Sequence, residues 1–111
     1  MSKQYLLSID NGTQSIRAII FDKNGLELAK STIPITPYFS TQAGWAEQDP
    51  IYFWESVCKA TNTLWSQTKI QKSDINAVSV TTQRATFVTL DDKGKPLRPA
   101  LSWLDLRKVN T

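Results

Sequence analysis

Apolar and polar residues alternate along two runs near the start of the chain, at residues 5–9 and 16–21, with a short polar stretch at residues 10–15 between them. Alternation with a period of two is typical of a β-strand that buries one face. Two such strands joined by a turn rich in Asn and Gly predict a β-hairpin. This hairpin is the element around which we expect the rest of the domain to be arranged.

A third antiparallel strand is predicted directly after the hairpin. The Asn-Gly pair at residues 24–25 is a second turn signal, and the extended pattern that follows covers about residues 26–35. Pro34 and Pro37 then end regular pairing, because proline has no N–H to donate to a neighbouring strand. The polar residues 36–48 predict an irregular loop. In it, Trp45 either forms a lid over a ligand or packs against the domain, and the large apolar area of its side chain favours packing.

The next segment carries a helical pattern that begins with Asp49 and Pro50. Aspartate is a favoured N-cap residue and proline a favoured first residue of a helix. Apolar side chains then recur at helical spacing to about residue 68. They are Phe53, Trp54, Val57, Leu64 and Trp65. We therefore predict one amphipathic helix with an apolar face toward the sheet.

Short strands are predicted after the helix, at residues 76–82 and 86–90, followed by a turn at residues 91–94 and a last apolar stretch at residues 100–103. A strand reached through a helix is usually parallel to the strand before it. Three antiparallel strands, a helix and a further strand indicate an α/β domain.

Composition narrows the class of protein. The chain has 111 residues, a net charge of +3, no histidine and a single cysteine, Cys58. One cysteine excludes an internal disulfide and fits a reducing cytoplasm, where we expect the protein to act. No apolar run approaches the ~20 residues that span a bilayer. The basic residues are scattered singly, so we predict no nucleic-acid partner and no membrane partner.

The hairpin turn collects the groups that bind phosphate and a hard metal ion. Asp10 enters it, Gly12 leaves the backbone open to a ligand and favours a positive φ, and Arg17 follows on the second strand. Amides of such a turn can form a nest for an anion, and the hydroxyls of Thr13 and Ser15 add donors. An ordinary hairpin, with Asp10 capping local amides, explains the same residues equally well.

A second group of polar residues lies where predicted strands end, which is where open α/β sheets bind ligands. Gln83 and Arg84 offer directional donors, Asp105 can accept two hydroxyls, and the indole of Trp103 can stack on a sugar. These residues suit a small polyhydroxylated substrate. The residues alone favour a plainer interpretation, in which Arg84, Asp105 and Arg107 form surface ion pairs and Trp103 lies in the core.

Four motifs together resemble the FGGY family of carbohydrate kinases, which includes glycerol kinase and xylulokinase. Ile-Asp-Asn-Gly-Thr-Gln-Ser-Ile-Arg at residues 9–17 resembles the family's first phosphate-binding motif. Gly-Trp-Ala-Glu-Gln-Asp-Pro at residues 44–50 resembles the entrance to its first long helix. The segments at residues 80–86 and 103–107 resemble those that line its sugar pocket. The motifs occur in the family's order and cover almost the whole chain.

The resemblance implies a ribonuclease-H-like fold, of which residues 1–111 form the first part of the N-terminal domain. It also implies transfer of the γ-phosphoryl group of ATP to a small sugar or polyol, with Mg²⁺. In that scheme Asp10 orients the metal ion, Gly12, Thr13 and Gln14 surround phosphate oxygens, and Arg17 offsets negative charge. The alternatives are a non-catalytic sugar- or phosphate-binding module and an actin-like ATPase fragment.

The same resemblance implies that Gln83, Arg84, Trp103 and Asp105 bind the sugar or polyol. Ala85 departs from the pattern, because glycerol kinases carry a glutamate at this position, and this departure makes glycerol a doubtful substrate. The general-base aspartate and the second domain are expected beyond Thr111. We therefore predict that the 111-residue segment alone is inactive and that the complete enzyme is a homodimer or homotetramer.

Overall fold

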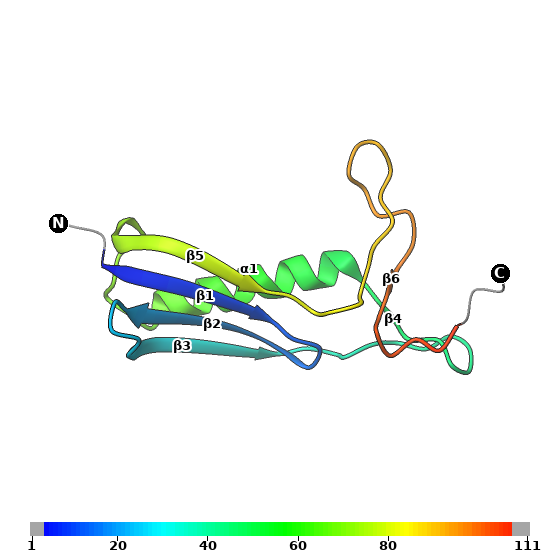
Figure 1. The fold of residues 1–111 in the computed structure, drawn as a ribbon, viewed down its shortest axis with the longest axis horizontal. Helices are drawn as coiled ribbons and strands as arrows, with labels where there is room; N and C mark the ends of the chain where they lie inside the picture. The colour runs from blue at the N-terminus through cyan, green and yellow to red at the C-terminus, as the bar shows by residue number, and fades with distance from the viewer. Residues whose placement is uncertain (1–3, 108–111) are drawn as a thin grey trace.

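Four strands form the main sheet of the computed structural model, which describes residues 4–107 (Figure 1). The strand order is β3-β2-β1-β5. The strands are β1 (Tyr5–Asn11), β2 (Ser15–Asp22), β3 (Glu27–Pro34) and β5 (Ile75–Thr81). Strands β1, β2 and β3 are antiparallel, whereas β5 lies parallel to β1. The mixed α/β arrangement predicted from the sequence is confirmed.

The first hairpin follows the predicted boundaries closely, and its register decides which side chains meet. Asp10 on β1 faces Arg17 on β2 across the ladder. The third strand also forms as predicted and ends at Pro34. Its turn is fixed by Asp22, whose carboxylate accepts hydrogen bonds from the amides of Asn24 and Leu26 at 2.8 and 2.9 Å.

Helix α1 (Pro50–Ser66) crosses one face of the sheet and forms the core with it (Figure 1). Asp49 caps the helix, because its side chain accepts a hydrogen bond of 3.0 Å from the amide of Ile51. Leu64 on the helix and Ile16 and Ile20 on β2 are fully buried. Full burial of each such side chain contributes about 1.5–3 kcal/mol, so this contact holds the helix against the hairpin.

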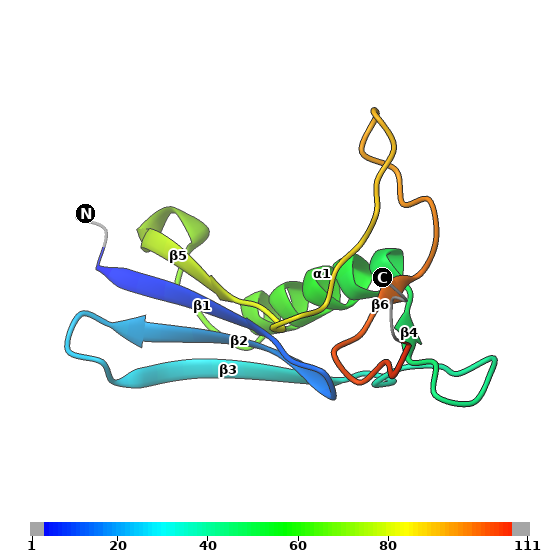
Figure 2. The ribbon, with the colours of Figure 1, turned by 45° about the vertical axis from the view of Figure 1, so that its right-hand side comes forward.

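The chain beyond β5 departs from prediction, because residues 86–90 do not form a strand. Only isolated bridges occur, from Phe87 to Leu101 and from Leu90 to Pro96. Phe87 and Leu90 are more than half exposed, so no apolar layer stabilises an extended strand here. Residues 86–99 instead project from the body of the domain as an arm (Figure 2).

The last described segment returns from the arm to the loop before the helix. There β6 (Ala100–Leu101), within the apolar stretch predicted at residues 100–103, pairs antiparallel with β4 (Glu47–Gln48), a short strand that the hydrophobic pattern did not indicate. A 3-10 turn (Lys72–Asp74) connects α1 to β5. Within residues 4–107, no helix combines the length and hydropathy that a membrane-spanning segment needs.

Candidate functional site

A cavity of about 460 Å³ opens where the hairpin turn meets the chain that leaves β5. It lies beyond the carboxyl ends of the parallel strands β1 and β5, the usual ligand position in such sheets. Its walls combine the turn of the hairpin, the residues that follow β5 and Trp103. The lining residues are Asp10, Asn11, Gly12, Thr13, Thr82, Gln83, Arg84, Ala85 and Trp103.

Six of the nine residues singled out from the sequence therefore share one cavity, although they come from three separate segments. They are Asp10, Gly12, Thr13, Gln83, Arg84 and Trp103. The other three, Gln14, Arg17 and Asp105, do not line it. Gln14 is exposed at the tip of the turn, and its carbonyl oxygen accepts a hydrogen bond of 3.0 Å from the amide of Ile35.

Asp10 and Arg17 form an ion pair at the edge of the cavity. The guanidinium of Arg17 donates to Oδ2 of Asp10 from Nε, at 3.2 Å, and also from Nη2. Because both hydrogen bonds fall on Oδ2, Oδ1 of Asp10 takes no part in the pair. The side chains are 29% exposed for Asp10 and 45% exposed for Arg17, so the pair is accessible to a ligand.

Gly12 is required in the turn for a reason other than the one predicted. A positive φ was expected, but Gly12 does not adopt one. A Cβ on Gly12 would instead lie 2.9 Å from the carbonyl oxygen of Ser15, too close for a backbone atom that cannot move aside alone. The Gly12 amide donates to that same oxygen at 3.1 Å. The Gly12 N–H is thus already used within the turn, which corrects its expected place in an anion nest.

Two side-chain hydrogen bonds attach distant segments to the turn. Nε2 of Gln83 donates to the carbonyl oxygen of Gly12 at 3.1 Å. Nε1 of Trp103 donates to Oγ1 of Thr13 at 3.2 Å. Trp103 is 54% exposed, so the interpretation that buries it in the core is wrong. Trp103 lines the cavity instead.

Arg84 and Ala85 form the part of the wall that faces solvent. Arg84 is exposed and lines the cavity without being held in an ion pair within residues 4–107. Ala85 has a φ of 53°, a left-handed conformation that few residues other than glycine adopt. Such backbone strain persists where the surrounding structure enforces it, and it is common near ligand sites.

Asp105 lies in a neighbouring hollow of about 420 Å³ that shares Ala85 and Trp103 with the cavity. Its carboxylate accepts hydrogen bonds from Nε and Nη2 of Arg107, at 2.9 and 2.7 Å, and from the amide of Ala46 at 2.8 Å. The side-chain hydrogen bonds from Arg107 are the main reason why the pKa of Asp105 lies well below its usual range. Asp105 is therefore an ionised group that ties the end of the chain to the loop before α1.

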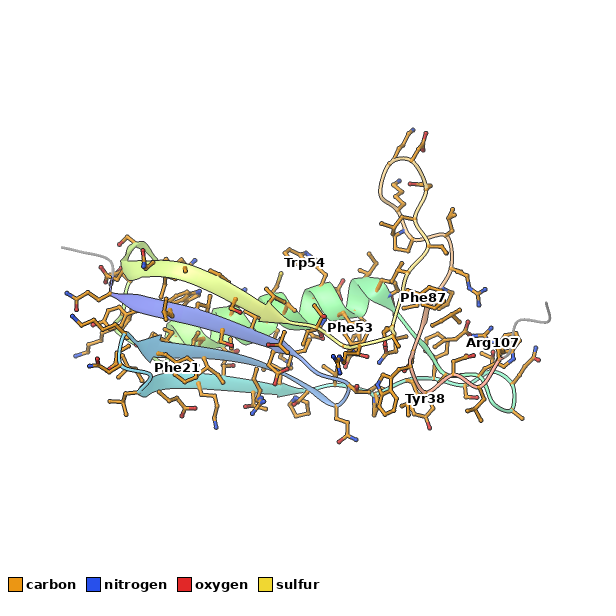
Figure 3. The ribbon with its side chains drawn as sticks, in the orientation of Figure 1. Phe21, Tyr38, Phe53, Trp54, Phe87 and Arg107 are labelled. Carbon is orange, nitrogen blue, oxygen red and sulfur yellow. The ribbon has the colours of Figure 1, made fainter. Side chains whose placement is uncertain are left out.

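Glu47 is the charged residue that sequence reasoning missed. It is only 5% exposed, and its Oε2 accepts from Nη2 of Arg98 at 3.1 Å and from Nη2 of Arg107 at 3.3 Å. The guanidinium carbon of Arg107 also lies 4.0 Å from the centre of the Trp45 ring, so Trp45 packs against the domain as expected. Figure 3 shows Arg107 in this region, away from the main sheet. The motif around residue 47 was visible in the sequence, but nothing in it indicated the two arginine partners.

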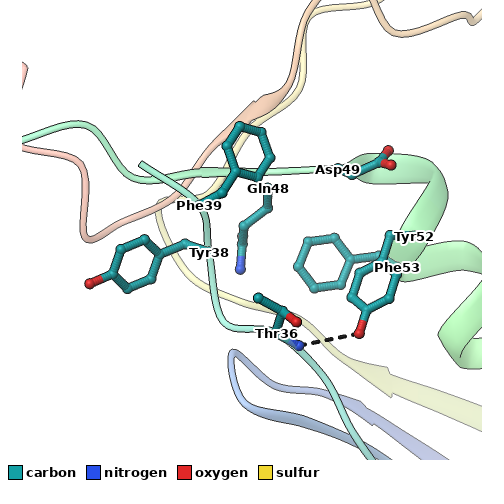
Figure 4. A pocket seen from close by; sticks show the side chains of 7 residues that line it. All are labelled: Thr36, Tyr38, Phe39, Gln48, Asp49, Tyr52 and Phe53. Atoms are coloured by element: carbon teal, nitrogen blue, oxygen red, sulfur yellow. Dashed lines mark hydrogen bonds between the residues drawn. The ribbon is translucent and has the colours of Figure 1, made fainter. Parts of the chain in front are cut away.

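A smaller hollow of about 210 Å³ lies between the loop after β3 and the start of α1 (Figure 4). Aromatic rings, among them Tyr38 and Phe53, form most of its wall. The amide of Thr36 donates to the hydroxyl of Tyr52 at 3.2 Å across its floor. It contains none of the predicted site residues. Within the part of the chain that the structure describes, no three potential metal-ligating side chains cluster together.

Comparison with known families and proteins identifies the family to which the described segment is similar. The model of the FGGY family of carbohydrate kinases, N-terminal domain, matches residues 5–111. The chain is 42% identical to the glycerol kinase of Lactobacillus acidophilus over 104 residues, which cover 93% of the chain and 21% of that relative. The glycerol kinase of Thermococcus onnurineus is 38% identical over 100 residues, covering 90% and 20%. The chain spans about a fifth of the length of these curated relatives.

Solved structures show the same fold. The xylulose kinase from Rhodospirillum rubrum superposes with a TM-score of 0.81 at 30% identity, covering 94% of this chain and 21% of that one. The Plasmodium falciparum glycerol kinase with ADP gives a TM-score of 0.76 at 29% identity, covering 96% and 21%. These likenesses confirm the ribonuclease-H-like fold expected from the motifs.

Proposed function

The chain belongs to the FGGY family of carbohydrate kinases, and on that premise we propose that it supplies the first phosphate-binding hairpin and part of the sugar pocket of an ATP-dependent kinase. The substrate is a small sugar or polyol. One observation carries the proposal: Asp10, beside Arg17, opens onto the cavity that Gln83, Arg84 and Trp103 also line. Phosphate-binding and hydroxyl-binding groups must meet in this way for a phosphoryl group to pass between two substrates.

On the phosphate side, the turn acts through its backbone and its ion pair. The amides of Thr13 and Gln14 have no acceptor within residues 4–107, and we assign them to phosphate oxygens in place of the Gly12 amide. Arg17 holds Asp10 by Oδ2 and offsets negative charge at the turn. Phosphoryl transfer depends on positioning and charge neutralisation, which is the work these groups can do.

Mg²⁺ fits the donor set of the turn. Magnesium in kinases is typically bound by one or two carboxylates together with substrate phosphates and water. Asp10 supplies one partly exposed carboxylate, whose Oδ1 remains outside the pair with Arg17. Asp10 would therefore hold the ion through Oδ1. A bound Mg²⁺ supplies the charge that neutralises the phosphate oxygens during transfer.

On the substrate side, we assign Arg84 and the indole face of Trp103 to direct contact with hydroxyl groups and C–H faces of the sugar. Gln83 donates one N–H to Gly12 and accepts from Thr86 at its oxygen, so a second N–H and a second lone pair of this amide remain for the substrate. Contact between Asp105 and the substrate stays a prediction, because it requires the hydrogen bonds from Arg107 to open. A cytoplasmic location and a homodimer or homotetramer also stay predictions.

The identity of the sugar depends on the wall at Ala85. The curated relatives are named glycerol kinases, whereas the methyl group of Ala85 cannot accept hydrogen bonds from hydroxyls. Without an acceptor here, we propose a substrate larger than glycerol, such as a ketose or a longer polyol. Glycerol belongs in the test panel as the comparison that decides this point.

The test is ADP release by the protein at its native length, with Mg²⁺ and ATP, across glycerol, longer polyols and ketoses. The intact mass of the native protein is measured first. A mass that corresponds to 111 residues would exclude the kinase and leave only a binding module. Asp10→Ala should lower turnover by two or more orders of magnitude, and Asp92→Asn, a change in the exposed arm, should not. Turnover by Asp10→Ala within a few-fold of wild type would refute the role of Asp10.

A further inference from the structure

The hydroxyl group of Thr86 connects two residues of the cavity wall. Oγ1 of Thr86 donates to Oε1 of Gln83 at 3.2 Å, and it accepts a hydrogen bond from the main-chain amide of Trp103 at 3.3 Å. Gln83 and Trp103 lie about twenty residues apart in the sequence and belong to different segments of the fold. One hydroxyl group thus serves as donor to the first and acceptor from the second.

The same two residues each hold the hairpin turn by their other polar atoms. Gln83 donates to the carbonyl oxygen of Gly12 at 3.1 Å, and the indole of Trp103 donates to the hydroxyl of Thr13 at 3.2 Å. The four hydrogen bonds close a ring that runs from Thr86 through Gln83 to the turn and back through Trp103. The turn and the substrate cavity are joined through this ring.

Thr86 itself does not line the cavity of about 460 Å³. It lies half-buried behind the wall, in a separate hollow of about 230 Å³ that it shares with Asn11 and Gln83. A ligand in the larger cavity would meet Gln83 and Trp103, but not Thr86. Any influence of Thr86 on the reaction must therefore act through the residues that it holds.

We propose that Thr86 is a positioning residue, which sets the orientation of Gln83 and Trp103 and so couples the phosphate-binding turn to the substrate cavity. The inference rests on the proposed function and assigns a role to a residue that lies within the segment at residues 80–86 but was given no role there. The ring fixes the Gln83 amide, because the Gly12 carbonyl needs a donor and Thr86 donates to the oxygen. Without the Thr86 hydroxyl, only the hydrogen bond to the Gly12 carbonyl opposes rotation of this amide.

The variant that tests the proposal is Thr86→Val, which keeps the shape of the side chain and removes the hydroxyl. Thr86→Ser restores the hydroxyl and is the rescue variant. Thr89→Val is the matched control, because it makes the same substitution on the same arm. Within the part of the chain that the structure describes, the Thr89 hydroxyl has no hydrogen-bond partner.

Kinetics of the protein at its native length give the first readout. Loss of the two hydrogen bonds at Thr86 should lower kcat/KM for the sugar by about tenfold in Thr86→Val. Thr86→Ser and Thr89→Val should stay within about twofold of wild type. The proposal would be overturned if Thr86→Val kept the kcat/KM of wild type. It would also be overturned if Thr86→Ser lost as much kcat/KM as Thr86→Val. Wild-type protein without turnover on any sugar would refute the proposed function instead.

The second readout does not require turnover. In protein labelled with ¹⁵N-tryptophan, the NMR signal of the Trp103 indole N–H is assigned by its loss in Trp103→Phe. The rate at which this indole proton exchanges with solvent reports the hydrogen bond to Thr13. Exchange should be faster in Thr86→Val and unchanged in Thr86→Ser and Thr89→Val. Unchanged exchange in a folded Thr86→Val protein would show that the hydroxyl does not hold the ring.

Discussion

Replacing Gly12 by alanine tests whether the close packing of the hairpin turn matters for catalysis. The added Cβ would lie 2.9 Å from the carbonyl oxygen of Ser15, well inside van der Waals contact. This oxygen belongs to the backbone and also accepts the hydrogen bond from the Gly12 amide, at 3.1 Å. The turn must therefore open, and the carbonyl group of Gly12 moves with it.

The size of the effect follows from the bonds that are lost. Opening the turn breaks the bond from Gly12 to Ser15 and displaces the Gly12 carbonyl from Nε2 of Gln83. Two hydrogen bonds at a net 0.5–1.5 kcal/mol each amount to about 1–3 kcal/mol. If both are needed to hold the transition state, kcat/KM falls roughly 5- to 150-fold.

Gly25→Ala is the matched control. No atom lies within 4 Å of a Cβ built at Gly25, but its φ is +87°, so alanine is strained there without any clash. The strain costs about 1–2 kcal/mol and lowers the free energy of unfolding. The turn at Gly25 joins β2 to β3, outside the cavity, so kcat/KM should stay within about twofold of wild type.

The assay combines urea unfolding with ADP release at saturating ATP for both variants. We expect Gly12→Ala to lose catalytic efficiency and Gly25→Ala to lose stability alone. A Gly12→Ala protein with wild-type kcat/KM would show that the turn tolerates the methyl group, and the argument from the Ser15 carbonyl would fail. Equal catalytic losses in both variants would trace the effect to global destabilisation.

Three further predictions concern the rest of the chain. Asp49→Ala removes the acceptor of the Ile51 amide and should lower the free energy of unfolding by about 1 kcal/mol in urea, whereas Asp49→Ser should restore most of it. Arg107 depresses the pKa of Asp105 below its ordinary 3.8, so this pair stabilises the fold above about pH 4 and its contribution is lost as the pH falls further. Asp105→Asn should therefore flatten the fall in stability between about pH 4 and pH 2, and the same slope as wild type would contradict the assignment. The 111-residue chain alone should release no ADP in the presence of sugars, and sugar-dependent release from it would refute that expectation.

The sequence predicted the elements whose signals are local. Alternation over residues 5–22 placed the hairpin, and Asp49 with Pro50 placed the start of α1, because caps, turns and amphipathic periods act over a few residues. The ends of predicted strands also marked Gln83 and Trp103 as candidate ligand-binding residues, and the structure places them in one cavity with the turn. The family motifs added the fold that these elements share.

Non-local pairing could not be predicted in the same way. Residues 86–90 have the composition of a strand but no apolar layer to pack against, and they form an arm instead. Glu47 pairs with Arg98 and Arg107, which lie about fifty and sixty residues further along the chain. Thr86 lies within the segment at residues 80–86, but its partner Trp103 comes within reach only once the arm has folded back.

The order β3-β2-β1-β5 leaves the sheet with two unlike borders. The border strand β3 carries Glu27 and Lys30 and ends in Pro34, all of which discourage another strand from pairing with it. The border strand β5 has no charged residue and no proline, and Val78 and Val80 on it are more than half exposed. A further strand, from this chain or from another, is therefore discouraged at the β3 border and meets an unprotected border only at β5.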